Sequence, residues 1–405
     1  MSKAVKLYCD DVDITNSSFR ALLPNIQKLI KRIIEENNFT NYEIIIDDLN
    51  TGGDNFLGIL YTINIKGKTL DSDKEVNIFV KEKITLNDQN CLNSTKLYAN
   101  EEFIYKDLSK VITNLQDKAN IPPEDRFKIA KAYDETNNDA IILENLCKRG
   151  FTRYDRNKVT SLKVIELSIK ELAKFHGMSF VIEKKMPEYY KEKIAGFDAS
   201  YNFDENWHKL MDKILKNTAN LFDGETKKKL EAVLPVWLEK IPNYHYDKTT
   251  RCTLCHGDYK NNNIMFRVID GEPVELIIID YQLLEYGNPI KDLVYFLFYG
   301  SDREFRREHL NDLKDLYFET LSRFLQYFEM DVEMEFPREK FEQIYKEWLD
   351  YGCLMCLFIT VFMNAPDTGL DLRTVRINEI PYNPNEEQKK MIRELVEDFI
   401  DWGYL

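Results

Sequence analysis

The stretch Cys255-His256-Gly257-Asp258-Tyr259-Lys260-Asn261-Asn262-Asn263-Ile264-Met265-Phe266 decides the fold, together with the later run Ile277-Ile278-Ile279-Asp280-Tyr281-Gln282. An aspartate on a tight loop, Asp258, can accept the proton of a substrate hydroxyl group. Asn263 follows in the same loop and Asp280 ends the next apolar run, so both can supply oxygen ligands to Mg²⁺. The pattern therefore predicts a base and a metal site suited to phosphoryl transfer.

Residues on both sides of this loop resemble a known family. His256-Gly257-Asp258 with Asn263, then Asp280-Tyr281-Gln282, and then Gly287 to Leu293 are similar to the pattern of the ecdysteroid kinase-like family, also called CHK kinase-like. This family belongs to the protein-kinase-like superfamily of aminoglycoside and choline phosphotransferases, and the resemblance covers nearly the whole chain. It implies a small-molecule kinase that uses ATP and Mg²⁺, with Asp258 as catalytic base and with Asn263 and Asp280 as metal ligands.

The apolar pattern divides the chain into two parts. Residues 19–37 show helical periodicity, and the runs 42–46, 56–65 and 76–83 are typical of antiparallel strands. Beyond Gly150, helical spacing recurs in the long segments 159–180, 203–221, 226–241, 304–328, 337–363 and 384–402. With the resemblance, this predicts an α+β, bilobal protein-kinase-like fold. A nucleotide-binding lobe with a small antiparallel β-sheet and helices would span residues 1–146, and a larger, mainly helical lobe with the catalytic loop and acceptor site would span 147–405.

A glycine turn, Gly52-Gly53-Asp54-Asn55, separates the first two predicted strands. Such a turn lets backbone N–H groups approach phosphate oxygens, but the same composition is typical of an ordinary hairpin. The turn resembles the Gly-(Asp/Glu)-Asn-(Phe/Tyr) turn of the family. The resemblance therefore implies that Gly53, Asp54 and Asn55 bind the nucleotide.

Lys81 ends an apolar run, where a strand would direct its ammonium group toward the α- and β-phosphates. Lys83 shares that strand face and is the alternative, although Phe-Val-Lys resembles the strand lysine of the family. On the next predicted helix, either Glu101 or Glu102 would pair with the lysine. The Glu-x-x-x-Tyr pattern of the family, which ends here at Tyr105, favours Glu101.

Other site residues are implied by the resemblance alone. The apolar run 141–146 lies where the superfamily joins its lobes, so the carbonyl group of Glu144 and the N–H group of Leu146 would contact adenine. His256 would brace the catalytic loop, and Asp292 would accept hydrogen bonds from the loop backbone. Both residues are expected to position Asp258 rather than to react.

Aromatic residues and one further histidine on the predicted helices are better explained by packing. His176 lies on an apolar helix face, where a histidine is more often a hydrogen-bonded core residue than a catalyst. Tyr351, Phe358 and Phe362 fall near one helix face, and such a stripe is more often core than pocket. A pocket for an apolar acceptor in this region is a hypothesis.

Composition and net charge limit the classes of partner that the protein is expected to bind. The net charge of −14 and the isoelectric point near 5.1 would repel a nucleic-acid backbone. The first residues lack the apolar region of a signal peptide, and the apolar stretch 353–363 is shorter than the roughly 20 residues that span a bilayer. We therefore expect a cytoplasmic protein that binds neither nucleic acid nor membrane, and no protein partner is predicted.

The chain has seven cysteines, and without an export signal they are expected to be reduced thiols. The segment from Cys252 to His256 contains a c-type haem attachment pattern, and Cys353 and Cys356 form a second pair. The missing export signal and the apolar surroundings favour buried packing for both pairs.

The acceptor is not determined by these residues. The resemblance implies a hydroxylated small molecule, either an ecdysteroid or a xenobiotic alcohol that is inactivated by phosphorylation. One alternative is a choline- or ethanolamine-type kinase, and another is an inactive nucleotide-binding pseudokinase that serves as a scaffold. The presence of Lys81, Asp258, Asn263 and Asp280 together argues against the pseudokinase.

Overall fold

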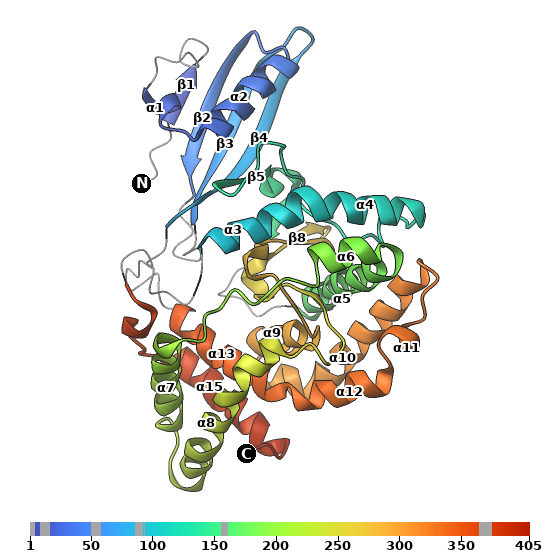
Figure 1. Ribbon diagram of the computed structural model, residues 1–405. Coiled ribbons are helices and arrows are strands. Elements are labelled where there is room, and N and C mark those ends of the chain that lie inside the picture. The colour runs from blue at the N-terminus through green and yellow to red at the C-terminus, as the bar shows by residue number, and fades with distance from the viewer. Residues whose placement is uncertain are drawn as a thin grey trace.

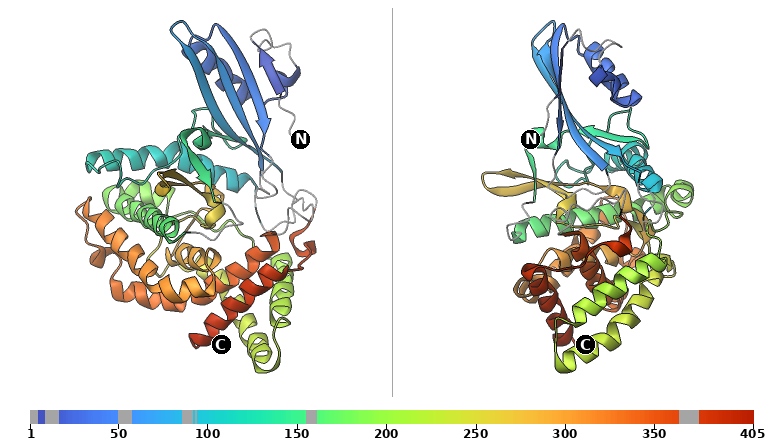
Figure 2. Two further views of the ribbon diagram at one scale, coloured as in Figure 1. Left: turned by 180° about the vertical axis from the view of Figure 1, so that it is seen from behind. Right: turned by 90° about the vertical axis from the view of Figure 1, so that its left-hand side faces the viewer.

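The computed structural model describes residues 5–8, 17–49, 58–85, 92, 94–154, 161–363 and 375–405. Figure 1 shows a β-sheet with a helix against it at the top and a larger group of helices below. The two views in Figure 2 show the same division from behind and from the side. The expected fold class is confirmed, because a small antiparallel sheet and a larger helical part form the protein.

Among the described residues, five antiparallel strands form the sheet, in the order in which they occur along the chain. They are β1 (Val5–Tyr8), β2 (Asn41–Asp48), β3 (Gly58–Lys68), β4 (Asp73–Lys83) and β5 (Ala140–Glu144). The three strands predicted from alternation correspond to β2, β3 and β4, and the apolar run between the lobes corresponds to β5. Strand β1 has no predicted counterpart, because four residues are too few to establish an alternation.

Alternation along β4 sends its side chains to two different environments. Ile78 and Val80 are buried against the helix α2 (Pro24–Glu36) on one face of the sheet. Phe79 and Lys81 project from the opposite face into a cavity between the sheet and the helical part. The two-residue period of a strand therefore places the lysine inside the molecule without placing it in the apolar core.

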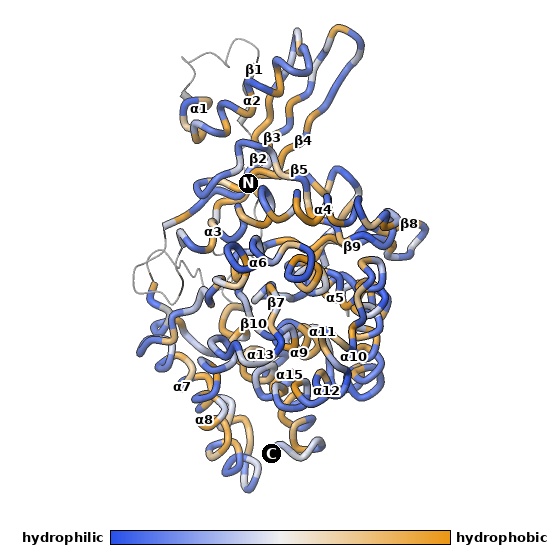
Figure 3. The backbone as a smooth tube through the Cα atoms, turned by 45° about the vertical axis from the view of Figure 1, so that its right-hand side comes forward, coloured by the Kyte–Doolittle hydropathy of each residue, from blue (hydrophilic) through white to orange (hydrophobic). Residues whose placement is uncertain are grey.

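The predicted helix over residues 19–37 is divided in the structure. A short helix, α1 (Ser17–Arg20), precedes α2, which begins at Pro24. Proline lacks an N–H group and is tolerated in the first turn of a helix, so it marks a new start. Hydrophobic and hydrophilic residues alternate along α2 in Figure 3, because Ile26, Leu29 and Ile33 face the sheet.

Helices form most of the second part of the protein (Figure 1). Between the sheet and this part, α3 (Ser94–Glu102) continues through a π-helical segment, Phe103–Leu108, into α4 (Ser109–Lys118). The others are α5 (Leu162–Lys185), α6 (Pro187–Lys193), α7 (Glu205–Ala219), α8 (Gly224–Tyr246), α9 (Ile290–Tyr299), α10 (Arg303–Gln326), α11 (Val332–Glu335), α12 (Arg338–Glu347), α13 (Leu349–Met363) and α15 (Glu386–Asp401). Within the described ranges, no helix has both the length and the apolar character needed to cross a bilayer.

The expectation of one helix over residues 337–363 is wrong, because the structure has two. Trp348 leaves helical geometry, with φ −106° and ψ 11°, and so separates α12 from α13. Its ring packs 4.7 Å from the ring of Tyr244 on α8. Burial of this large side chain outweighs the weak local preference for one continuous helix.

Short strands frame the two segments that carry the predicted catalytic motifs. Strand β7 (Thr253–Cys255) pairs with β10 (Glu285–Gly287), and β8 (Ile264–Ile269) pairs with β6 (Phe151–Arg153) and β9 (Glu272–Ile278). The buried thiols of Cys252 and Cys255 lie at β7, and those of Cys353 and Cys356 lie on α13. The structure thus buries both cysteine pairs, as expected from packing.

A buried ion pair joins β10 to α9. Glu285 contacts Lys291 and accepts a hydrogen bond from Nδ1 of His245 at 2.7 Å, and all three side chains are almost fully buried. Burial opposes the charged form of Glu285, but the hydrogen bond from His245 and the charge of Lys291 outweigh it and lower the pKa of Glu285 to about 2. Burial also lowers the pKa of His245, so Lys291 is the cation that balances Glu285 at neutral pH.

We expect Glu285→Gln to lower the free energy of unfolding by about 3 kcal/mol at neutral pH, because it leaves the buried Lys291 unpaired. The folded pKa lies below the ordinary value of 4.5, so this stabilisation is complete above that pH and is lost as the pH falls toward 2. Urea denaturation at several pH values measures it. The matched control is Glu272→Gln, which removes an exposed pair with Lys163. A Glu285 variant as stable as that control at neutral pH would contradict the expectation.

Candidate active site

The predicted catalytic loop turns sharply at Gly257. The φ of this residue is +78°, and a Cβ atom at this position would lie 2.0 Å from the carbonyl oxygen of Leu283. Only glycine combines this backbone conformation with so close an approach. The turn lets the loop between β7 and β8 fold back, so that Asp258 and Asn263 come together.

Asp292, on the first turn of α9, holds this loop by its backbone. Its carboxylate accepts hydrogen bonds from the N–H groups of His256 at 2.6 Å and Gly257 at 2.9 Å, and from Nε2 of His176 at 3.1 Å. Burial alone would raise the pKa of Asp292, but the hydrogen bonds from His176 and from the backbone of His256 lower it. The carboxylate is therefore charged and positions the residues next to Asp258.

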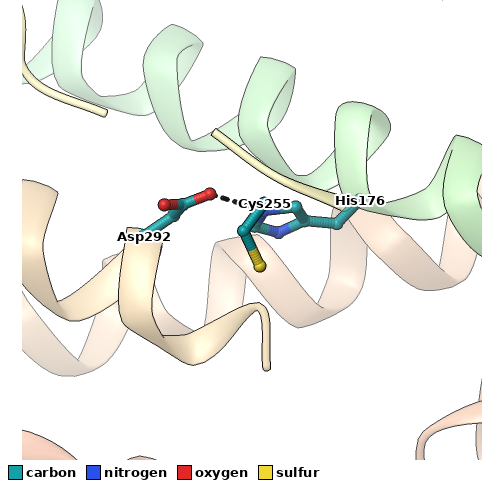
Figure 4. A group of neighbouring side chains, drawn as sticks. All are labelled: His176, Cys255 and Asp292. Atoms are coloured by element: carbon teal, nitrogen blue, oxygen red, sulfur yellow. Dashed lines mark hydrogen bonds and ion pairs between the residues drawn. The ribbon is translucent and has the colours of Figure 1, made fainter. Parts of the chain in front are cut away.

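Figure 4 shows that His176, Cys255 and Asp292 approach one another, and their potential ligand atoms all lie within 4.8 Å. The chemistry is that of a hydrogen-bond network rather than of a metal centre. Burial raises the pKa of the Cys255 thiol well above its ordinary value, which favours the neutral thiol as a hydrogen-bond donor. The thiol instead donates toward the carbonyl oxygens of Gly287 and Asn288, at 3.3 and 3.4 Å.

His256 braces the loop from the side, as the resemblance implies. Its Nε2 donates to the carbonyl oxygen of Ile279 at 3.0 Å, so its Nδ1 accepts from the backbone N–H group of Asp258 at 3.3 Å. Burial lowers the pKa of His256, which keeps the ring uncharged. The ring thus connects the catalytic loop to the residue that precedes Asp280.

The carboxylate of Asp258 is surrounded by donors. Nδ2 of Asn263 lies 3.0 Å from Oδ2 and also donates to the backbone carbonyl of Asp258 at 2.8 Å. The ammonium group of Lys260 lies 2.8 Å from both carboxylate oxygens, and the hydroxyl group of Tyr295 donates to Oδ1 at 3.3 Å. The predicted base and the predicted metal ligand Asn263 are therefore in direct contact.

Lys81 joins the sheet to the second motif. Its ammonium group lies 2.8 Å from Oε2 of Glu101 and 2.6 Å from Oδ1 of Asp280. Asp280 has a positive φ of +65°, which is rare outside glycine and occurs most often in asparagine and aspartate. Glu102 instead contacts Lys106, and Lys83 pairs with Asp139, so neither alternative is part of this cluster.

The three charges of this cluster affect one another. Burial opposes the charged form of Lys81, but Asp280 and Glu101 outweigh it and raise the pKa of the lysine. Burial likewise opposes the charge on Asp280, but Lys81 lowers its pKa. Burial raises the pKa of Glu101 to about 7, and the nearby Asp280 adds to the effect. Lys81 and Asp280 are thus the charged pair of the site.

Helix α3 is tied both to the sheet and to the second motif. The hydroxyl group of Tyr98 donates to the carbonyl oxygen of Glu82 on β4 at 2.9 Å. Nδ2 of Asn100 donates to the carbonyl oxygen of Gln282 at 2.8 Å, close to Asp280. These bonds flank Glu101 and fix its position relative to Lys81.

Lys81, Glu101, Asn263 and Asp280 line one cavity of about 550 Å³, together with Glu144 and Leu146. This volume lies within the range of small-molecule sites. Its other walls are mainly apolar and include Leu60, Phe79, Ile141, Leu143, Met265 and Ile279. The predicted phosphate residues Gly53, Asp54 and Asn55 lie outside the described residues.

Two residues that contact Asp258, Lys260 and Tyr295, were not among the predicted site residues. Lys260 stands two positions after Asp258 in the quoted loop. The sequence therefore already showed a positively charged residue close to the predicted base. Tyr295 follows Asp292 by three residues, which places the two on one face of α9. Helical spacing from Asp292 could have identified it.

The geometry corresponds to a known class of enzyme. In protein kinases, a lysine on a strand forms an ion pair with a helix glutamate, while an aspartate and an asparagine hold metal ions near a catalytic aspartate. The structure brings the same residue types together here, in the contacts of Lys81 with Glu101 and Asp280 and of Asn263 with Asp258. The fold and the site therefore define a kinase.

Residues 52–330 match the family described as the ecdysteroid kinase-like family, and this match covers more than half of the chain. The chain belongs to the ecdysteroid kinase-like family and is a small-molecule kinase. No curated protein matches the chain.

Several solved structures resemble the protein at low sequence identity. Choline kinase LicA from Streptococcus pneumoniae is 15% identical with a TM-score of 0.39, and the alignment covers 93% of this chain and 99% of that one. The GDP complex of aminoglycoside 2'-phosphotransferase-IIIa is 11% identical with a TM-score of 0.40, covering 92% and 98%. An ethanolamine kinase from Plasmodium vivax is 15% identical with a TM-score of 0.35, covering 82% and 83%.

We expect Glu101→Gln to weaken nucleotide binding by about tenfold, because Lys81 loses the carboxyl group that lies 2.8 Å from its ammonium group and helps to hold it in place. Glu102→Gln is the matched control, since it changes the adjacent residue but affects only a partly exposed pair with Lys106. Titration calorimetry with ADP and with ATP measures both variants. Equal effects of the two substitutions would contradict the assignment of Glu101.

We expect Asp292→Asn to lower turnover by about a hundredfold while leaving ADP affinity nearly unchanged, because misplaced loop residues affect the reaction more than nucleotide binding. Steady-state kinetics and ADP titration separate the two effects. Tyr317→Phe is a milder variant, since it removes only the 2.7 Å hydrogen bond to His176 behind Asp292. Loss of ADP affinity in proportion to turnover would show a general loss of folding instead.

Proposed function

We propose that this protein is a Mg²⁺-dependent ATP phosphotransferase that phosphorylates a hydroxyl group of an apolar small molecule, either an ecdysteroid or a xenobiotic alcohol. The observation that carries the proposal is that the Lys81–Asp280 ion pair lies on the wall of the cavity that also contains Asn263, which contacts Asp258. The proposal includes a nucleotide-binding lobe over residues 1–146 and a lobe over 147–405 that binds the acceptor.

The cavity suits a nucleotide. Apolar walls can cover the adenine ring, and the segment from Glu144 to Leu146 offers backbone groups at the end of β5. The side chain of Glu144 contacts Arg149 and the backbone of Lys131, which leaves recognition to its main chain. Lys81 supplies a cation for the phosphates.

The donor set suits Mg²⁺. Asp280 offers a carboxylate and Asn263 an amide oxygen on the same cavity wall, and Mg²⁺ prefers oxygen ligands with several waters retained. The bound ion would neutralise charge on the phosphate groups. No residue of this set is a thiol or an imidazole, so the site favours a hard cation.

The residues of the loop provide the transfer step. Asp258 orients the acceptor hydroxyl group and receives its proton as the hydroxyl oxygen forms a bond to the γ-phosphorus. The bond between that phosphorus and the bridging oxygen breaks, and ADP leaves with the electron pair. Lys81 holds the phosphates, and Asp292 and His256 keep Asp258 in place.

Aromatic side chains of α9 and α13 support an apolar acceptor. The Tyr295 ring, which contacts Asp258 through its hydroxyl group, lies 5.9 Å from the ring of Tyr299. On α13, the Phe358 ring lies 6.2 Å from that of Tyr201 and 5.4 Å from that of Phe362. Nearby Glu285 is balanced by Lys291, so it offers no free anionic charge to a choline-like cation.

We expect Asp258→Asn to lower turnover by about 10²–10⁴-fold while nucleotide binding is retained. The assay transfers labelled phosphate from ATP with Mg²⁺ to a panel of ecdysteroids, plant glycosides, choline, ethanolamine and aminoglycosides. Asp302→Asn, which changes a helix cap on α10, is the control. Transfer to choline or ethanolamine alone would replace the apolar acceptor by a cationic one. Nucleotide binding that ignores Mg²⁺, without any transfer, would favour a pseudokinase.

A further inference from the structure

The carboxylate of Asp258 already has its full complement of hydrogen bonds. Lys260 contacts both oxygens, Asn263 contacts Oδ2, and Tyr295 contacts Oδ1. A carboxylate has about four lone-pair directions, and these four contacts use them. They occupy the positions at which an acceptor hydroxyl group would donate, so one donor must leave before the base can act.

Two of the three donors are held by their surroundings. Tyr295 is only 3% exposed and is packed within α9 beside Tyr299. The side-chain amide of Asn263 donates to the backbone carbonyl of Asp258, and the backbone carbonyl oxygen of Asn263 accepts from the N–H group of Ile279 at 3.0 Å. Moving either residue would break the loop geometry that positions the base.

Lys260 is the donor that can leave. Its ammonium group is at the end of a flexible four-carbon chain, and the side chain is 15% exposed. Lys260 also precedes Asn262 and Asn263 in the chain, and both of these residues line the nucleotide cavity. A triphosphate in that cavity carries more negative charge than one carboxylate, and it would attract the ammonium group away from Asp258.

We propose that Lys260 controls access to the base and is a catalytic residue. Without a triphosphate, its ammonium group occupies both oxygens of Asp258. With a triphosphate bound, the ammonium group contacts the γ-phosphate and frees one oxygen of Asp258 for the acceptor hydroxyl group. The same oxygen then receives the hydroxyl proton as the acceptor oxygen bonds to the γ-phosphorus and ADP departs. This inference rests on the proposed function and adds a residue to its site.

The test compares two nucleotides in the intact protein. With Mg²⁺ present, titration calorimetry gives the affinities for ADP and for AMP-PNP, a non-hydrolysable ATP analogue. We expect Lys260→Ala to weaken AMP-PNP binding by about tenfold and to change ADP binding by less than about twofold, because only AMP-PNP offers a γ-phosphate. Lys83→Ala is the matched control, since this lysine pairs with Asp139 outside the cluster, and it should change neither affinity.

The outcomes separate this inference from the proposed function. If the native protein binds neither nucleotide, the proposed function itself is wrong. If it binds both, and the ratio of the two affinities is the same in Lys260→Ala, Lys260 does not contact the γ-phosphate and only this inference is overturned. Lys260→Gln, which retains most of the chain length, replaces the alanine variant if thermal melting shows that the latter unfolds. Lys260→Arg should restore the preference for AMP-PNP.

Discussion

The hydrogen bonds of the buried Asp292 carboxylate are the interaction on which the site depends. A buried carboxylate is costly unless donors surround it, and here two of the donors are the backbone N–H groups of His256 and Gly257. The same hydrogen bonds provide the carboxylate of Asp292 with donors and provide the backbone N–H groups of the loop with an acceptor. Because Asp258 follows Gly257 directly, the hydrogen bonds that compensate the buried charge of Asp292 also fix the position of the proposed base.

A second constraint acts at the sheet. Strand β4 presents its isoleucine and valine side chains to α2 and the side chain of Lys81 to the cavity, where Glu101 and Asp280 balance its charge. The three residues come from a strand, a helix and a loop that are distant in the sequence. Their mutual attraction in a buried setting, with the hydrogen bonds of Tyr98 and Asn100, connects the two parts of the protein.

Much of this arrangement could be predicted from local patterns. Alternation in the runs around β2, β3 and β4 and helical spacing in α5 and α10 identified these elements, because burial of one face imposes a period on the sequence. Strand β1 was too short to show such a period. The break at Trp348 depends on a ring that packs against Tyr244, which no local pattern reveals. The preference for Glu101 over Glu102 came from a family pattern, and the structure supplies its physical reason, since only Glu101 faces Lys81.

The sequence by itself determined the chemistry that is available: an aspartate, an asparagine and a second aspartate at fixed spacing, with a lysine at the end of an apolar strand. Residue types and short spacings are local properties, so a single sequence can show them. Only the tertiary structure decided which groups meet, because the contacts of Asp258 with Tyr295 and of Asp292 with His176 join segments far apart in the chain. The charge state of Cys255 was decided in the same way, since burial depends on the packing of the whole protein.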